Sequence, residues 1–347
     1  ENTRHTEPDS RRTVHRTLCF RMLASIQRVF TQQGNIISIG SRRAMSSSVG
    51  SEKSFRFAGC QMKVSTDSEL NRQRATTLVA EAASNGAQVI ALPECWNCPY
   101  SNGAFPKYAE TCPEVPRAHD DDAGTRSADA VGESSLLLAA LAKRHGVYLI
   151  GGSVPERATD SRIYNTCLMY GPDGVLLAKH RKMHLFDIDV PGKMTFRESD
   201  TLSAGNQITA VQTKYGKFGI GICYDLRFPE YAQLLAIDYG CEFLCYPGAF
   251  NTTTGPAHWE LLLRGRAVDN QLYVAAVSPA RDPDSSYQAW GHSTVVDPWG
   301  VVVSTTEHEE AIVYADVDLK RVHEVRQQIP VRTQKRHDIY SSPAPAK

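Results

Sequence analysis

From residue 55 onward, short apolar runs alternate with segments in which apolar residues recur every three or four positions. The runs predict buried strands, and the spaced positions predict amphipathic helices. Two segments with apolar runs on either side of a glycine-containing turn predict hairpins. Strands are expected at 55–62, 87–94, 147–154, 217–222, 242–248, 272–278 and 311–318, helices at 69–86, 133–146, 229–240, 257–270 and 319–328, and hairpins at 164–180 and 291–306.

This order of elements indicates an α/β fold in which hairpins interrupt the alternation. Two packed sheets with helices outside them explain the pattern best. No proline- or glycine-rich linker and no internal repeat divides the chain, so we expect one domain at 54–341, a basic leader at 1–53 and a short tail at 342–347. The acidic, small-residue segment 114–132 is typical of a surface loop.

Composition places the chain among ordinary globular proteins. It has 347 residues, 41% of them hydrophobic and 22% charged, with a formal net charge of zero. A balanced charge gives no general attraction to nucleic acid or to an anionic membrane, and no apolar run is long enough for a membrane span. We therefore expect neither nucleic acid nor a membrane as a partner, and the small-molecule partner expected for this chain comes from its motifs and not from its composition.

The leader changes this balance locally. Residues 11–50 contain seven arginines and no Asp, Glu or Lys, which is typical of a mitochondrial transit peptide. An untranslated leader or a disordered tail is the alternative, with Met22 or Met45 as the true start. The expected location is therefore mitochondrial or cytoplasmic.

The nine cysteines are odd in number and follow no secretory signal, so reduced thiols are expected. Cys95 and Cys98 form a CxxC, but a zinc site would need a second Cys or His pair. Cys223 has a different setting, because it lies between the strand 217–222 and a helix that begins near Pro229. A cysteine there is expected to have its pKa lowered by the helix dipole, although an inert core thiol is the alternative.

Two further residues follow predicted strands. Glu94 ends the run "VIALPE", and Lys182 follows the second hairpin strand in "HRKMHLFD". A carboxylate can accept the proton of a thiol, a lysine can neutralise an oxyanion, and a thiolate can attack a carbonyl. With Cys223 they form a set suited to amide hydrolysis through a thioester, for which neither a metal nor an organic cofactor is needed.

The segments "ALPE", "HRKMHLFD" and "GICYDLRFPE", in this order, resemble the signature motifs of the nitrilase superfamily, the carbon–nitrogen hydrolases. The stretches "KMHLFDIDVPGKMTFRES", "YPGAFNTTTGPAHWELLLRGRAVDNQ" and "AWGHSTVVDPWG" resemble its omega-amidase branch. The resemblance covers about residues 54–341. It implies a four-layer αββα sandwich that pairs into a homodimer.

The resemblance also implies roles for individual residues. Cys223 would be the nucleophile, Glu94 the general base and acid, and Lys182 the cation that faces the oxyanion. Glu198, in "FRES", would orient the lysine or the hydrolytic water. The backbone N–H of Tyr224 would be a second oxyanion donor.

An omega-amidase hydrolyses the distal amide of 2-oxoglutaramate or 2-oxosuccinamate. The alternative within the superfamily is a nitrilase or an N-carbamoyl hydrolase. A papain-like peptidase or a metallohydrolase would need flanking motifs that the chain lacks, and a scaffold role would be favoured only if a catalytic position were replaced. Candidates for substrate binding are His184, Phe186, Arg197, Phe250, Thr252 and Thr253, whereas Arg227 and Glu230 are expected to form a structural ion pair.

Overall fold

The computed structural model describes residues 53–116, 131–336 and 338–339. The predicted leader except its last residue, most of the predicted loop 114–132, and the predicted tail lie outside these residues. None of the helices within the described ranges is long and apolar enough to cross a membrane.

The described chain alternates between strands and helices, as its hydrophobic pattern predicts. Its first half contains β1 (Ser54–Gln61), α2 (Ser68–Ser84), β2 (Val89–Ala91), α3 (Phe105–Tyr108), α4 (Glu133–His145), β3 (Tyr148–Ile150), β4 (Val154–Arg157), β5 (Ile163–Tyr170), β6 (Leu176–Arg181), β7 (Asp187–Val190) and β8 (Met194–Arg197). The second half contains β9 (Thr209–Gln212), β10 (Lys217–Ile220), α5 (Pro229–Ile237), β11 (Phe243–Pro247), α6 (Gly255–Asn270), β12 (Tyr273–Val277), β13 (Thr294–Val296), β14 (Val302–Thr305), β15 (Ala311–Asp318), α7 (Lys320–Gln328) and α8 (Val331–Gln334).

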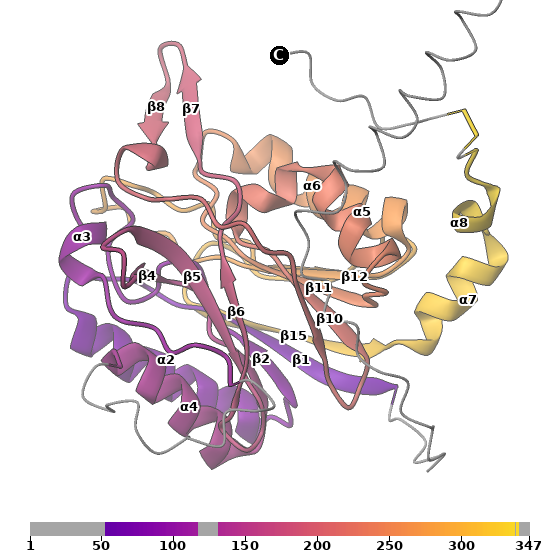
Figure 1. Ribbon diagram of the computed structural model, residues 1–347, viewed down its shortest axis with the longest axis horizontal. Coiled ribbons are helices and arrows are strands. Elements are labelled where there is room, and N and C mark those ends of the chain that lie inside the picture. Colours follow the sequence, from indigo (N-terminus) through magenta and orange to yellow (C-terminus); the bar gives the residue numbers. More distant parts are fainter. Residues whose placement is uncertain (1–52, 117–130, 337, 340–347) are drawn as a thin grey trace, which may run out of the picture. The chain divides into compact units, whose positions relative to one another are not determined.

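Two sheets form the middle of the molecule. The first has the order β15-β1-β2-β3-β5-β4, with β6 also paired to β5, and the second has the order β14-β13-β12-β11-β10-β9. Helices α2 and α4 cover the first sheet, and α5 and α6 cover the second (Figure 1). The expected four-layer αββα sandwich is therefore the observed fold.

Aromatic side chains hold the two sheets together. Phe55 and Phe57 of β1 meet Phe243 of β11, with ring centroids 5.5 and 5.4 Å apart. Phe218 of β10 packs on both sheets, 5.3 Å from Phe55 and 5.0 Å from Phe243. These rings are buried. Removing this apolar surface from water fixes how the two sheets face each other, and therefore how their strand ends align.

One predicted strand is broken in a way that affects the site. The run 147–154 forms β3 and β4, separated by Gly151 and Gly152. Gly152 has φ +63°, and a Cβ there would lie 2.2 Å from the carbonyl oxygen of Pro93. Only glycine fits this conformation and this contact. The break lets the chain pass beside the turn that carries Glu94.

A short hairpin, formed by β7 and β8, was not predicted. Its four-residue strands pair only with each other and project from the sandwich (Figure 1). Strands this short leave too few alternating positions for a sequence pattern to identify.

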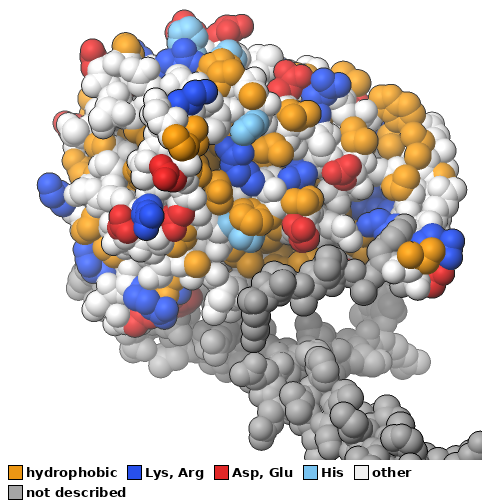
Figure 2. Space-filling view, turned by 90° about the horizontal axis from the view of Figure 1, so that it is seen from above, with side chains coloured by type: hydrophobic (Ala, Val, Ile, Leu, Met, Phe, Trp, Pro, Cys, Tyr) orange, Lys and Arg blue, Asp and Glu red, His pale blue; other side chains and the backbone are white. Residues whose placement is uncertain are grey.

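The outer surfaces of α5 and α6 carry exposed apolar side chains. Leu234 and Ile237 of α5 and Leu261 and Val268 of α6 are between 37% and 67% exposed. Figure 2 shows hydrophobic side chains grouped over its right-hand half, the side on which α5, α6 and α7 lie in Figure 1, with basic side chains between them.

Candidate active site

The ends of three strands converge at one edge of the sandwich. Glu94 follows β2, Lys182 directly follows β6, and Cys223 follows β10. Strand β2 belongs to the parallel part of the first sheet and β10 to that of the second. Because the carboxyl ends of parallel strands lie at the same edge of a sheet, residues far apart in the sequence come together at that edge.

Lys182 is shared between two carboxylates. Its Nζ lies 2.9 Å from Glu94 Oε1 and 2.9 Å from Glu198 Oε1, and all three side chains are fully buried. Burial alone would lower the Lys182 pKa, but Glu198 and Glu94 outweigh it and hold that pKa well above its usual value. The lysine is therefore a fixed buried cation.

Neutral donors make further hydrogen bonds to both carboxylates. Asn165 Nδ2 donates to Glu94 Oε1, and the backbone N–H of Ala249 donates to Glu94 Oε2, each at 2.8 Å. Tyr100 donates its hydroxyl to Glu198 Oε1 and the Phe186 N–H donates to Glu198 Oε2, each at 2.7 Å. Buried polar atoms that are satisfied in this way hold a single geometry.

Cys223 occupies a strained backbone position. It is the first residue of a short 3₁₀ helix, Cys223–Arg227, and has φ +46°. A non-glycine residue in this region costs free energy and persists only where its surroundings enforce it. Tyr224 follows in the first turn, where N–H groups have no acceptor within the helix.

The expected lowering of the Cys223 pKa is wrong. Burial and then the Glu94 charge raise the pKa of this thiol well above its usual value, and Lys182 opposes them only in part. The longer helix α5 begins six residues later, at Pro229, so its dipole is too distant to outweigh desolvation. Burial also raises the Glu94 pKa, against the effect of Lys182. The resting site therefore contains a neutral thiol next to the Glu94 carboxylate.

A buried aspartate joins the nucleophile turn to the lysine segment. Asp225 Oδ2 accepts from the Ile222 N–H at 2.8 Å and from His180 at 3.2 Å, while Oδ1 accepts from the His184 N–H at 3.0 Å and from its ring at 2.7 Å. Lys182 lies between these two histidines in the chain. Despite burial, the hydrogen bonds from His180 and His184 keep the Asp225 pKa well below its ordinary value.

A narrow pocket adjoins the thiol and contains an arginine. It has no room for a water molecule in this structure, so its side chains must move to admit a substrate group. It is lined by Phe186, Cys223, Tyr224, Arg227, Ala249, Phe250, Thr254 and Tyr287. The Arg227 guanidinium carbon lies 4.4 Å from the Phe250 ring centroid, and Nη1 lies 3.0 Å from His258 Nδ1. Burial lowers the pKa of Arg227, and its Nε has no hydrogen-bond partner. The expected ion pair with Glu230 is not formed, because Arg227 turns toward the pocket while Glu230 is exposed.

The six candidates for substrate binding have different positions. Phe186 and Phe250 line the narrow pocket. His184 lies beside the pocket, where it stacks on Phe228 and binds Asp225. Arg197 and Thr252 are exposed and Thr253 is half-buried, and none of the three lines the pocket.

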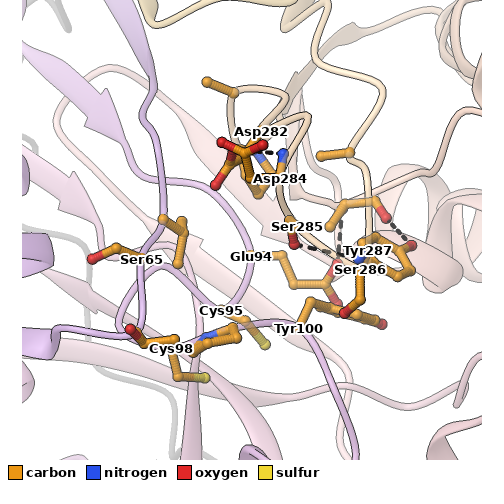
Figure 3. Close-up of a pocket in the computed structure, with 17 residues that line it drawn as sticks. Ser65, Glu94, Cys95, Cys98, Tyr100, Asp282, Asp284, Ser285, Ser286 and Tyr287 are labelled. Carbon is orange, nitrogen blue, oxygen red and sulfur yellow. Dashed lines mark hydrogen bonds between the residues drawn. The ribbon is translucent and has the colours of Figure 1, made fainter.

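A larger cavity of about 370 Å³ is lined by Glu94 (Figure 3). Cys95, Cys98 and Tyr100 line it near Glu94, and Asp282 and Asp284 lie across it. Tyr287 borders both spaces and donates its hydroxyl to the Ala249 carbonyl at 2.5 Å. Glu94 therefore lines the acidic-rimmed cavity, whereas Cys223 and Arg227 line the narrow pocket.

Several residues of this site were missed by the sequence analysis. Asn165 and Tyr100 lie in stretches that carry no distinguishing pattern. Asp225 and Arg227 had a usable signal, because they are charged residues beside the cysteine in an otherwise apolar segment.

Among the described residues, the His and carboxylate side chains grouped closely enough for a metal are His292, Glu307 and His308, which lie outside this cluster.

The fold and this cluster define a hydrolase that acts on carbon–nitrogen bonds. The family model for carbon–nitrogen hydrolases matches residues 56–327, and the chain belongs to that family. It is similar to the omega-amidase NIT2 of Danio rerio, 55% identical over 287 residues, which are 83% of this chain and 96% of that one. It is 54% identical over 288 residues to the omega-amidase NIT2 of Homo sapiens, covering 83% and 97% of the two chains.

A solved structure extends the likeness to three dimensions. Saccharomyces cerevisiae Nit3, a member of branch 10 of the nitrilase superfamily, has a TM-score of 0.72 and 42% identity, with 82% of this chain and 97% of that chain covered. The predicted membership of the nitrilase superfamily is confirmed.

Asp225→Asn tests whether the buried aspartate positions the site. The amide has no charge and brings an N–H₂ group against N–H donors, so we expect the free energy of unfolding to fall by about 3–5 kcal/mol and kcat to fall more than KM rises. Because the Asp225 pKa is depressed on folding, its contribution is complete above the unfolded pKa of about 4 and is lost at lower pH. Urea unfolding at pH 7 and at pH 3 should show the gap to wild type narrow in acid.

Asp238→Asn is the matched control, because Asp238 is an exposed aspartate at the end of α5. It should leave both stability and turnover at wild-type values. Equal kcat in Asp225→Asn and wild type would contradict the positioning role.

Proposed function

We propose that this protein is an omega-amidase, which hydrolyses the distal amide of 2-oxoglutaramate and 2-oxosuccinamate to the dicarboxylate and ammonia. The observation that carries this proposal is the buried cluster of Glu94, Lys182 and Cys223 beside a pocket that contains Arg227. The names of the relatives that are 54–55% identical agree with it.

The first half of the reaction forms a thioester. Because the Cys223 pKa is raised, the thiol is protonated at rest and needs a base at the moment of attack. Glu94, which lies next to the thiol, accepts its proton while sulfur bonds to the amide carbon. Lys182 and the Tyr224 N–H stabilise the oxyanion. Glu94 then returns the proton to nitrogen, the carbon–nitrogen bond breaks, and ammonia leaves.

The second half uses the same residues for water. Glu94 takes a proton from a water molecule, whose oxygen attacks the thioester carbon, and the carbon–sulfur bond breaks. The proton returns to the sulfur and the acid product is released. Glu198 keeps Lys182 aligned through both steps, because it binds the lysine Nζ at 2.9 Å as a second carboxylate beside Glu94.

Arg227 is the proposed anchor for the carboxylate at the far end of the substrate. Its guanidinium lines the pocket next to Cys223, and no carboxylate of the described residues contributes to its pKa shift. A half-buried cation with an unpartnered Nε binds an incoming anion strongly. Arg197, exposed on the β7–β8 hairpin, is less suited.

The alternative is another carbon–nitrogen hydrolase, a nitrilase or an N-carbamoyl hydrolase. Such enzymes share the three catalytic positions, and only the pocket separates them. The basic pocket favours a substrate with a carboxylate distal to its amide, as an omega-amide has.

A homodimer paired across α5 and α6 is also proposed. Exposed apolar residues on neighbouring helices, such as Leu261 at 67% exposure, are what a protein interface buries (Figure 2). Thr254, directly before helix α6, lines the pocket, and His258 of α6 contacts Arg227, so pairing there would steady one wall of the pocket.

Ammonia release from a panel of substrates tests the activity. We expect turnover of 2-oxoglutaramate and succinamate, and none of an aliphatic nitrile or an N-carbamoyl amino acid. Cys223→Ala should lower kcat by at least about 1,000-fold, because no thioester forms. Turnover of the nitrile or the carbamoyl compound without amide turnover would replace the proposed activity by its alternative.

Arg227→Met tests the anchor, because it removes the guanidinium and keeps an unbranched apolar side chain. Loss of a charge-assisted contact should raise KM for 2-oxoglutaramate by about tenfold to a hundredfold, with little change for an amide that lacks a carboxylate. Arg197→Met is the control and should behave as wild type. If Arg197→Met raises KM for 2-oxoglutaramate and Arg227→Met does not, Arg197 is the anchor.

Leu261→Asp tests the dimer. Analytical ultracentrifugation should show a dimer for wild type and a monomer for the variant, because a buried unpaired charge opposes association. Val175→Asp, at a turn residue that is 46% exposed, is the control and should stay dimeric. A monomeric wild type would refute the pairing.

A further inference from the structure

Two histidines and a glutamate meet at the open end of the β13–β14 hairpin, outside the catalytic cluster. His292 precedes β13, and Glu307 and His308 follow β14. Their ligand atoms all lie within 4.8 Å of one another, and His292 Nδ1 is 3.9 Å from Glu307 Oε2. We propose that these three residues bind a divalent transition ion of the zinc, nickel and cobalt class.

The backbone brings these residues together in a fixed way. The His292 N–H donates to the Glu307 carbonyl at 2.9 Å. Gln61, at the end of β1, donates its side-chain amide to the carbonyls of Glu307 and Glu309 at 2.7 and 2.6 Å. The Arg281 N–H donates to the His308 carbonyl at 2.7 Å. Hydrogen bonds from three separate segments thus hold the loop that carries two of the ligands, which lowers the entropy lost on binding.

His292 is the most constrained of the three. It has φ +56°, its ring stacks on Trp290 at 4.3 Å, and its carbonyl accepts from Trp259 Nε1 at 2.6 Å. The preceding Gly291 packs closely against His308, since a Cβ on Gly291 would be 2.6 Å from His308 Cα. Backbone strain at a residue that carries a ligating side chain is common in functional sites.

The charged groups around the three proposed ligands favour a bound cation on balance. Glu309 Oε1 lies 3.2 Å from His308 Nε2, and Glu310 follows in the chain and accepts from the Lys63 N–H. Arg281 opposes a cation, but its side chain donates to the carbonyls of Ala289 and Trp290 and stacks on the Trp290 ring.

The donor set determines the class of metal. Two imidazoles and one carboxylate suit zinc and its neighbours, whereas calcium and magnesium prefer oxygen ligands alone. Metal–ligand bonds of about 2.1 Å require the ligand atoms to approach further. The side chains of Glu307 and His308 are 81% and 43% exposed and are free of packing that would prevent this movement. Water completes the coordination, and the amidase reaction does not use the ion.

Cobalt binding to the full chain tests the site. Protein without a histidine tag is stripped with EDTA, exchanged into metal-free buffer, and titrated with Co²⁺ by calorimetry and visible absorption. We expect one equivalent to bind without a thiolate charge-transfer band, and Zn²⁺ to displace it. Glu307→Gln and His308→Gln should each weaken binding at least about tenfold, with ammonia release unchanged.

His323→Gln is the matched control, because His323 pairs with a single carboxylate, Glu242, at 2.8 Å, without a second histidine. It should bind Co²⁺ as wild type does. The proposal fails if wild type binds no equivalent, if both ligand variants bind as tightly as wild type, or if a thiolate band accompanies the first equivalent, which would place the ion on cysteines instead.

Discussion

The site depends on one ionic arrangement, a lysine buried between two carboxylates. Removing three charged groups from water is costly, and only short contacts with satisfied hydrogen bonds repay it. Lys182 meets both Glu94 and Glu198 at 2.9 Å, and neutral donors fill the remaining carboxylate positions. The segments that carry Glu94, Lys182 and Glu198 must therefore pack in one arrangement, because a small shift would leave a buried charge unpaired.

This arrangement also determines when the Cys223 thiol loses its proton. Burial keeps Cys223 protonated, so it differs from cysteines that a helix dipole holds as thiolates. A neutral resting thiol avoids a further buried negative charge next to Glu94 and Glu198. In the proposed mechanism, proton transfer to Glu94 is coupled to attack on the substrate, and Lys182 is already in place for the oxyanion that develops.

Structural residues around the cluster maintain these distances. Asp225 joins the cysteine turn to the segment that carries Lys182, and Gly152 lets the chain pass against the turn that carries Glu94. Phe243 packs across the two sheets and sets their separation. None of these residues reacts with substrate, yet each limits where a reacting group can lie.

The sequence by itself determined the layered α/β fold, because hydrophobic periodicity is a local property, and its three strand-end motifs indicated Glu94, Lys182 and Cys223. It did not identify Arg227 as a pocket residue or predict the raised Cys223 pKa. Both depend on which surfaces become buried and which charges become neighbours when the two sheets pack. Asn165 and Tyr100 reach the carboxylates only through tertiary contacts, since 71 and 98 residues separate them from their partners. Burial and long-range proximity are properties of the folded chain, and only the tertiary structure decided them.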